Sequence, residues 1–222
     1  SIIFDMDGLM VDSEPLSYRA WNQVLQAYGY QMTDDIYRQI IGRRTDQAAE
    51  FILRHYPLPI TAAEFTVQKT AVFHEIRARG IPAMPGLMAL QAAIRERGIP
   101  WAVATSSPRD HAQIILAQLG LTAECQAIAA GNEVPHGKPA PDIYLLAAAR
   151  LGIDPSLCLA LEDSLPGCQA ARAAGMKVIA IPNGGTKTAT STSSMQAVFS
   201  HAFARYPSLQ QVAADLDTLL AD

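Results

Sequence analysis

The chain has 222 residues, of which half are hydrophobic and 17% are charged, a balance typical of a soluble globular protein made of one large domain or a domain with an insertion. Lysine and arginine number 17 against 21 aspartates and glutamates, a formal charge of -4, so charge gives no reason to expect nucleic acid or an anionic membrane as partner. Apolar runs fall short of the roughly 18 residues that span a bilayer. Three widely spaced cysteines argue against a disulfide framework and a structural zinc site. We therefore expect a cytoplasmic monomer.

The chain opens with a short apolar segment, residues 2–4, that leads into Asp5-Met6-Asp7-Gly8. Alternate side chains of an extended chain face the same way, so Asp5 and Asp7 are expected to share one side. Two nearby carboxylates disfavour each other's ionisation unless a cation offsets the repulsion. The pair therefore indicates a metal site or a proton-holding dyad. A structural alternative stays open, because Asp-Gly between apolar runs is also a strong hairpin signal.

A helical pattern follows, from about residue 15 to residue 82. Apolar residues at steps of three and four predict a first helix that ends at Gly29, and Thr33 and Thr45 can each begin another. A capping-box pattern at 61–64 predicts a fourth helix that stops at Gly80. The breaker-rich stretch 80–86 then looks like a return linker.

Beyond the linker, helical patterns alternate with short buried strands, expected at 101–105, 126–129, 157–161 and 178–181. This alternation predicts an α/β fold, a doubly wound, mostly parallel Rossmann-like sheet that the first strand joins. The helical block is then an all-α cap domain, 15–82, inserted into a core domain made of 1–14 and 83–222. Within the core, 203–206 is expected to form a last short strand and Ser208 to cap the terminal helix, while 184–194 has the composition of a surface loop.

Polar residues collect where the predicted strands end, which is where open parallel sheets bind ligands. The strand 101–105 leads into Thr105-Ser106-Ser107-Pro108, in which Ser107 is predicted to cap a helix with Pro108 at its first position. The loop after the third strand carries Lys138, and the fourth strand ends in Glu162-Asp163-Ser164. Each feature alone has an ordinary structural explanation. Together, carboxylates, hydroxyls and one lysine suit Mg²⁺ and phosphoryl transfer better than other reaction classes.

These motifs, in this order, resemble those of the haloacid dehalogenase superfamily, in its branch of capped small-metabolite phosphatases and beta-phosphoglucomutase-like enzymes. The first motif spans residues 5–14, the second is Thr105, the third is Lys138 within Gly137-Lys138-Pro139, and the fourth is Glu162-Asp163-Ser164. One such motif is weak evidence, but four in order at strand ends are specific. The resemblance covers residues 2 to about 182.

The resemblance implies a role for each motif residue. Asp5 is the expected nucleophile, which forms an aspartyl phosphate, and Asp7 is the expected general acid and then base. Mg²⁺ is expected on the Asp5 and Asp163 carboxylates and the backbone carbonyl of Asp7, with Glu162 at or next to the metal. Thr105 and Lys138 would bind the transferring phosphoryl group, and Ser106 and Ser107 are further substrate-binding candidates.

The choice within the family rests on a few positions. Dehalogenation does not need a leaving-group acid, so Asp7 favours phosphate chemistry. Sugar phosphomutases of this branch carry a histidine shortly after the first motif, where this chain has Ser17, so hydrolysis of a sugar phosphate or nucleoside-type monophosphate is favoured over a mutase. A non-catalytic binding module is a third reading, and the intact motif set counts against it.

The cap is expected to set substrate specificity. Arg44 is the first candidate for contact with the substrate, and Arg43 and Lys69 are weaker candidates.

Overall fold

The computed structural model describes residues 1–40, 45–182 and 202–221. The chain divides into two compact units: a core unit formed by Ser1–Asp12 with Pro82–Asp222, and a helical unit formed by Ser13–Ile81. Within the described ranges, no helix has the length and apolar character needed to cross a membrane.

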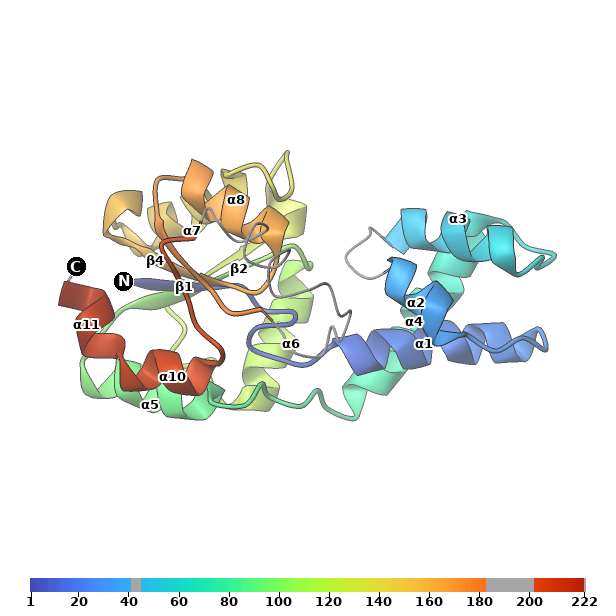
Figure 1. Cartoon of the computed structure of the whole chain (residues 1–222), viewed down its shortest axis with the longest axis horizontal. Helices are drawn as coiled ribbons and strands as arrows, with labels where there is room; N and C mark the ends of the chain where they lie inside the picture. Colours follow the sequence, from blue (N-terminus) through green and yellow to red (C-terminus); the bar gives the residue numbers. More distant parts are fainter. Residues whose placement is uncertain (41–44, 183–201, 222) are drawn as a thin grey trace. The chain divides into compact units, whose positions relative to one another are not determined.

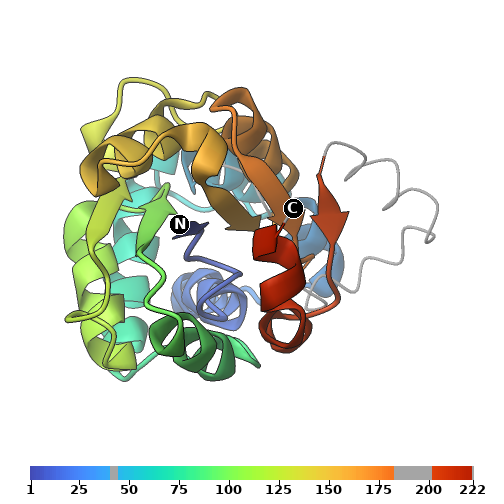
Figure 2. The ribbon, with the colours of Figure 1, turned by 90° about the vertical axis from the view of Figure 1, so that its left-hand side faces the viewer.

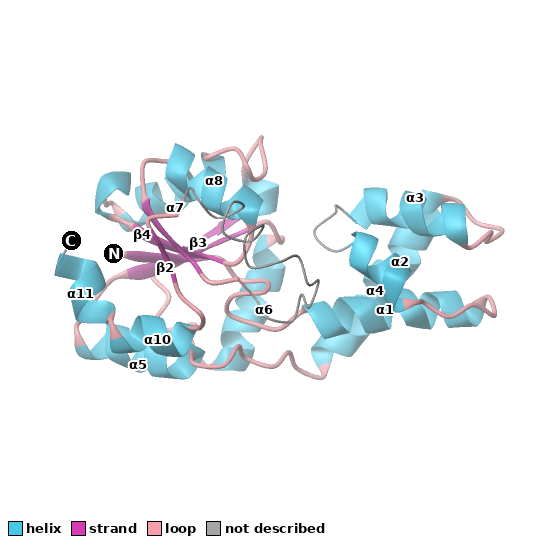
Figure 3. Cartoon of the chain, viewed as in Figure 1, coloured by secondary structure: helices cyan, strands magenta, loops and turns pink. Residues whose placement is uncertain are grey.

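The core unit is built on one parallel sheet with the strand order β3-β2-β1-β4-β5-β6 (Figure 3). The strands are β1 (Ile2–Phe4), β2 (Trp101–Thr105), β3 (Ala127–Ala130), β4 (Leu159–Glu162), β5 (Lys177–Ala180) and β6 (Ala204–Arg205). The first strand lies in the middle, because Ile2 is in register with Trp101 on one side and with Leu159 on the other. The hairpin alternative for Asp7-Gly8 is therefore wrong, and the chain turns there through a left-handed Gly8 with φ of 91°.

Helices lie on both faces of this sheet, with α7 and α8 on one side and α5 and α10 on the other (Figures 1 and 2). The helices of the core unit are α5 (Leu87–Glu96), α6 (Arg109–Leu119), α7 (Asp142–Leu151), α8 (Leu165–Ala173), α10 (Leu209–Ala214) and α11 (Leu216–Ala221), with short 3₁₀ helices η1 (Gly131–Glu133) and η2 (Pro155–Leu157). Gly120 and Gly152 end α6 and α7 in the left-handed conformation. Ser208 caps α10 through a hydrogen bond from the Gln211 N–H, as predicted.

The two faces of the sheet are packed differently. Small residues dominate the face under α7 and α8, where Ala102, Ala104 and Ala160 pack with the alanines of both helices around the buried ring of Tyr144. Small side chains let these helices lie close to the sheet, which brings polar groups of α7 within reach of the strand ends. On the other face Phe4 and Trp101 make an edge-to-face contact, with ring centroids 5.5 Å apart.

The helical unit consists of α1 (Glu14–Ala27), α2 (Asp34–Ile40), α3 (Thr45–His55) and α4 (Ala62–Ala78). Its own core gathers one apolar face from each helix, including Trp21, Leu25, Ile52 and Phe65. The predicted capping box at the start of α4 is present: the Glu64 N–H donates to the Thr61 hydroxyl, and the Thr61 N–H donates to the Glu64 carboxylate.

Candidate active site

Sheet register brings the first and fourth motifs together. Ile3 pairs with Ala160 and Phe4 with Leu161, so the next pair along the two strands is Asp5 and Glu162. The Asp5 N–H continues this pairing by donating to the Leu161 carbonyl at 3.0 Å. Because side chains alternate along a strand, Asp5 lies on the same face as Ile3, toward α7 and α8. Two carboxylates more than 150 residues apart in the chain thereby become neighbours.

Lys138 lies between these two carboxylates. Its ammonium group is 2.6 Å from Asp5 Oδ1 and 2.6 Å from Glu162 Oε1, and it also donates to the Ala104 carbonyl at 3.2 Å. Burial lowers the pKa of Lys138, but the charges of Asp5 and Glu162 outweigh burial and hold the pKa above its usual value. Lys138 is thus a fixed positive charge next to Asp5.

Glu162 is completely buried, and both of its oxygens are engaged. Oε1 accepts from Lys138 and, at 2.9 Å, from the hydroxyl of Tyr144. Oε2 accepts from the backbone N–H of Ser164 at 3.0 Å and from its hydroxyl at 2.9 Å. Gly167 in the first turn of α8 leaves the room for this carboxylate, since a Cβ at that position would lie 1.6 Å from Glu162 Oε1. The surroundings of Glu162 therefore hold Lys138 in place.

Three carboxylates could share a cation. Asp5, Glu162 and Asp163 offer oxygen atoms that all lie within 4.8 Å of one another. Burial, followed by the neighbouring carboxylates, raises the pKa of Asp163 well above its usual value, and burial raises the pKa of Asp5 to about 7 in spite of the opposing charge of Lys138. A divalent cation would offset this repulsion and return both groups to the ionised state, so the donor set fits Mg²⁺.

Gly8 lies directly against this carboxylate cluster. A Cβ there would be 2.2 Å from Asp163 Oδ2, and its φ of 91° is one that other residues rarely adopt. The glycine after Asp7 is therefore required both for the turn and for the approach of Asp163.

The hydroxyl of Ser107 contacts Asp7. It donates to Asp7 Oδ2 at 2.8 Å, and the Ser107 N–H donates to the Thr105 hydroxyl at 3.0 Å. The prediction that Ser107 caps α6 is wrong. Pro108 is the N-cap residue of α6, and its side chain accepts no hydrogen bond. The Ser107 hydroxyl instead donates to Asp7, whose charge makes its carboxylate a strong acceptor. Thr105 is buried and Ser106 is exposed.

The candidate residues of the helical unit are only partly described. Arg44, the first candidate for contact with the substrate, and Arg43 lie outside the described residues. Lys69 is described and is nearly buried, with its ammonium 5.3 Å from the ring centroid of Trp21 and 4.5 Å from that of Phe73. These positions suit cation–π attraction.

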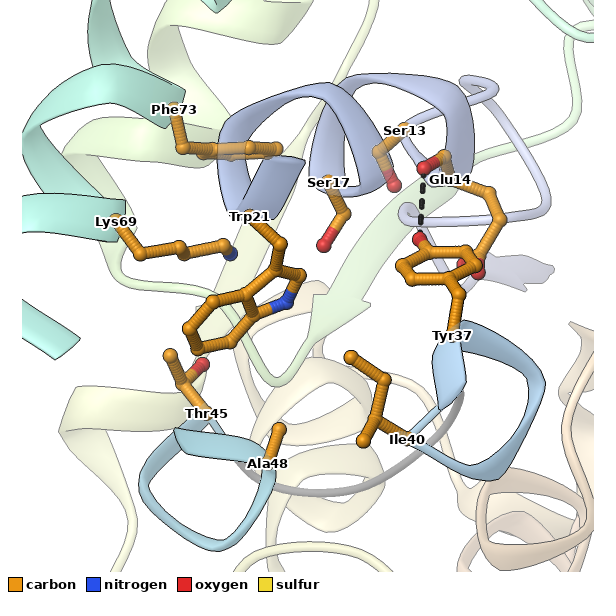
Figure 4. Close-up of a pocket in the computed structure, with 10 residues that line it drawn as sticks. All are labelled: Ser13, Glu14, Ser17, Trp21, Tyr37, Ile40, Thr45, Ala48, Lys69 and Phe73. Atoms are coloured by element: carbon orange, nitrogen blue, oxygen red, sulfur yellow. Dashed lines mark hydrogen bonds between the residues drawn. The ribbon is translucent and has the colours of Figure 1, made fainter. Parts of the chain in front are cut away.

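Lys69 lines a pocket of about 200 Å³ inside the helical unit, shown in Figure 4. Figure 4 shows the side chains of Ser17, Trp21 and Lys69 pointing toward one another. The Tyr37 hydroxyl donates to the Glu14 carbonyl at 3.0 Å, and burial, followed by the charge of Glu14, raises the pKa of Tyr37, so the hydroxyl stays protonated. The lining residues are Ser13, Glu14, Ser17, Trp21, Tyr37, Ile40, Thr45, Ala48, Lys69 and Phe73.

Sequence reasoning missed residues that shape the site without belonging to a motif. Tyr144 is the clearest case, because its hydroxyl reaches both Glu162 and, at 3.4 Å, Lys138. A signal was present: a single hydroxyl stands in the apolar segment 143–149, six residues after the motif lysine. Gly167 left no such signal, because its role depends on where Glu162 lies.

The chain is similar to known proteins over most of its length. The haloacid dehalogenase-like hydrolase family model matches residues 1–175. The chain is 38% identical to the Drosophila melanogaster protein named "Probable pseudouridine-5'-phosphatase", over 82% of this chain and 80% of that protein, and 35% identical to fructose-1-phosphate phosphatase YqaB of Escherichia coli, over 80% and 94%. The structure of CbbY from Rhodobacter sphaeroides in complex with phosphate has a TM-score of 0.79 at 32% identity and covers 97% of this chain and 98% of that one. The chain therefore belongs to the haloacid dehalogenase-like hydrolases and is an enzyme of their phosphatase group.

Proposed function

We propose that this protein is a magnesium-dependent phosphomonoesterase that acts on a small phosphorylated metabolite through an aspartyl phosphate on Asp5. The observation that carries the proposal is the buried contact between Lys138 and Asp5, 2.6 Å long, within a cluster that also holds Asp163. A carboxylate fixed next to a permanent positive charge can approach a phosphate dianion that would otherwise repel it. The same charge stabilises the negative oxygens of the phosphoryl group in transfer.

The reaction proceeds in two displacements. A carboxylate oxygen of Asp5 attacks phosphorus while the ester P–O bond breaks, and the carboxyl of Asp7 gives its proton to the leaving oxygen. Water then attacks the phosphorus of the aspartyl phosphate, Asp7 takes the proton of that water, and Asp5 and inorganic phosphate are released. The Ser107 hydroxyl, 2.8 Å from Asp7 Oδ2, orients the Asp7 carboxyl for both steps.

Other residues hold the reactants. Thr105 and Lys138 bind the phosphoryl oxygens, and Ser106 and Ser107 line the approach to them. Asp5, Asp163 and the backbone carbonyl of Asp7 would hold Mg²⁺, which supplies charge neutralisation at the phosphoryl oxygens when bound. Glu162 is near enough to join them, but its two oxygens already accept four hydrogen bonds. We therefore propose that Glu162 holds Lys138 in position.

The pocket of the helical unit is proposed to bind the part of the substrate that leaves. It combines aromatic faces from Trp21 and Phe73 with hydroxyls from Ser17 and Tyr37, and Lys69 and Glu14 bring opposite charges. Such a lining suits an uncharged group that carries hydroxyls or ring amides, and it suits a second phosphate less well. Relatives named as phosphatases of fructose 1-phosphate and of pseudouridine 5'-phosphate support a sugar or nucleoside here.

Phosphate release from a panel of sugar phosphates and nucleoside monophosphates tests the proposal. We expect turnover with Mg²⁺, its loss on chelation and its return when Mg²⁺ is restored. Substitution Asp5→Asn keeps the shape of the side chain but removes the nucleophile, so turnover should fall by about 10⁴-fold or more. An Asp5→Asn enzyme with ordinary turnover would contradict the proposal. Isomer formation from a sugar 1-phosphate, in place of phosphate release, would favour the mutase.

A further inference from the structure

The 3₁₀ helix that follows β3 carries a carboxylate held by two arginines. Glu133 Oε1 accepts from Arg109 Nε at 2.8 Å and from Arg150 Nη2 at 3.0 Å. Its Oε2 accepts from Arg150 Nη1 at 2.8 Å and from Arg109 Nη2 at 3.1 Å. These bonds from Arg150 and Arg109 lower the pKa of Glu133 to about 2. Two bidentate forks on one carboxylate fix its position more firmly than a simple surface ion pair. We call these three residues the Glu133 clamp.

The Glu133 clamp joins elements that are separate in the chain. Arg109 is the first residue of α6, Arg150 lies in the last turn of α7, and Glu133 ends η1. Glu133 Oε2 also accepts from the backbone N–H of Ala130 at 3.0 Å, and both arginines donate to the carbonyl of Ile128 in β3. The end of β3 and the segment 131–133 are therefore fixed to two helices.

The segment 131–133 in turn contacts the second motif. The Gly131 N–H donates to the Ser107 carbonyl at 3.0 Å, and a Cβ at Gly131 would lie 2.1 Å from the Ser106 carbonyl oxygen. Asn132 accepts from the backbone N–H of Arg109 at 3.2 Å, which satisfies a free donor in the first turn of α6. The backbone of Ser106 and Ser107 is thereby packed against a segment whose position the Glu133 clamp sets.

This series of contacts leads to Asp7, the proposed general acid. Ser107 places its hydroxyl 2.8 Å from Asp7 Oδ2 and its N–H 3.0 Å from the Thr105 hydroxyl. A shift of the Ser107 backbone would change both contacts together. Misplacement of a catalytic group by about 1 Å can cost on the order of 100-fold in rate.

We propose that Glu133 is a positioning residue, which orients Asp7 through Gly131 and Ser107 although it touches neither substrate nor metal. The inference rests on the proposed phosphatase function. The contacts of Glu133 with Arg109 and Arg150 would then affect catalysis, in addition to stabilising the packing of α6 and α7. If Glu133 acts through the acid, its loss should matter most for esters whose leaving group needs a proton.

Substitution Glu133→Gln tests this inference, because the amide keeps the size of the side chain but turns a donor toward the arginines. The matched control is Asp217→Asn, which breaks another bidentate pair of the core unit, between Asp217 and Arg97 at 2.6 and 2.9 Å. We measure kcat/KM for an alkyl phosphate from the panel and for p-nitrophenyl phosphate, whose leaving group departs without a proton. For Glu133→Gln we expect roughly a tenfold fall with the alkyl ester and about threefold or less with the aryl ester. Asp217→Asn should leave both values unchanged.

A double-mutant cycle with Ser107→Ala distinguishes an effect of Glu133 through Ser107 from a purely structural effect. If Glu133 acts through Ser107, the loss of kcat/KM in the double variant should be well below the product of the two single losses. Arg150→Gln, which leaves the Arg109 fork, replaces Glu133→Gln if that variant does not fold.

Equal losses with both esters, independent effects in the cycle, or a loss matched by Asp217→Asn would overturn the inference alone. A wild-type enzyme that releases no phosphate from any ester would overturn the proposed function and the inference with it. An active wild-type enzyme with the expected pattern supports both.

Discussion

The core unit and the helical unit use charge in different ways. At the strand ends of the core unit, charged groups are buried in contact with one another, and the partners are far apart in the sequence: Lys138 meets Asp5 across 133 residues. In the pocket of the helical unit the charged groups lie among aromatic rings and hydroxyls, and Lys69 faces Trp21 and Phe73. In the proposed function, the first arrangement stabilises developing charge, and the second offers weak contacts to many faces of an uncharged group.

The two arrangements differ in the free energy that is lost when one group is removed. Removing a group from the core cluster leaves a buried charge without its partner, which costs more than the pair itself contributes. Removing a group from the pocket costs contacts to neighbouring rings, such as those of Lys69 with Trp21 and Phe73, and, in the proposed function, a contact to the bound molecule. Substitutions in the two units should therefore differ in size and in the kinetic constant that they change.

After Asp5→Asn, the largest effect is expected from Asp7→Asn in the core unit, a change that leaves the Ser107 contact possible but removes the proton. The fall in kcat/KM should be about 10²- to 10⁴-fold for an alkyl phosphate, the usual contribution of general acid catalysis. With p-nitrophenyl phosphate the fall should be much smaller. Steady-state kinetics with both esters measure the difference, and an equal fall would show that Asp7 is not the acid.

Gly167→Ala should disturb the core cluster without removing any charge. The new Cβ would lie 1.6 Å from Glu162 Oε1, so Glu162 must move and Lys138 loses a partner. Overpacking of this kind costs about 1–3 kcal/mol in the free energy of unfolding, measured by urea denaturation. The control is Gly137→Ala, where a Cβ meets no atom within 4 Å and stability should stay within about 0.5 kcal/mol. Equal stability of the two variants would mean that Glu162 is not confined.

Lys69→Met tests the pocket of the helical unit. We expect KM for the preferred sugar or nucleoside phosphate to rise roughly tenfold, as the loss of one hydrogen bond from a charged donor implies. With p-nitrophenyl phosphate kcat should be kept. Arg54→Met is a suitable control, since Arg54 lies 5.7 Å over the ring of Phe51 in the same unit but does not line the pocket. A fall in kcat with every ester would place Lys69 in the chemistry instead.

The smallest effect concerns pH and the Glu133 clamp. Because the pKa of Glu133 is lowered from 4.5 to about 2 in the folded protein, the ionised carboxylate stabilises the fold above pH 4.5, and this stabilisation is lost as the pH falls toward 2. Solvent screening leaves about 1 kcal/mol of the effect. The difference in unfolding free energy between wild type and Glu133→Gln should narrow over that range. A difference that stays constant with pH would contradict the lowered pKa.

Much of the core unit could be predicted from the sequence. The strands β2 to β5 lie within two residues of their expected ranges, because short apolar runs between glycine-ended helices leave few other assignments. That β1 joins this sheet followed from a simpler argument, since the helical block offered no sheet for that strand to join; its central place is seen only in the structure. Motif order then predicted which side chains would gather at the strand ends.

Contacts that depend on packing could not be predicted in this way. Ser107 had two possible partners, a helix N–H that would donate to its oxygen in a cap and a distant carboxylate to which its hydroxyl donates, and the local pattern favoured the wrong one. Gly167 and Glu133 act through neighbours that are close only in the folded chain, so their spacing in the sequence carries no signal. Tyr144 stands out as the single hydroxyl of an apolar segment, but that pattern does not identify Glu162 and Lys138 as its partners. The pocket of the helical unit was missed for the same reason, because four helices contribute to its lining, three side chains from α1 and two from each of the others.

The most direct test of the central claim is acid quenching of the enzyme within the first turnover of a ³²P-labelled substrate, followed by peptide mapping. We expect acid-stable radiolabel on the peptide that contains Asp5, absent from the Asp5→Asn enzyme. Label on a different residue, or full turnover by Asp5→Asn, would contradict it.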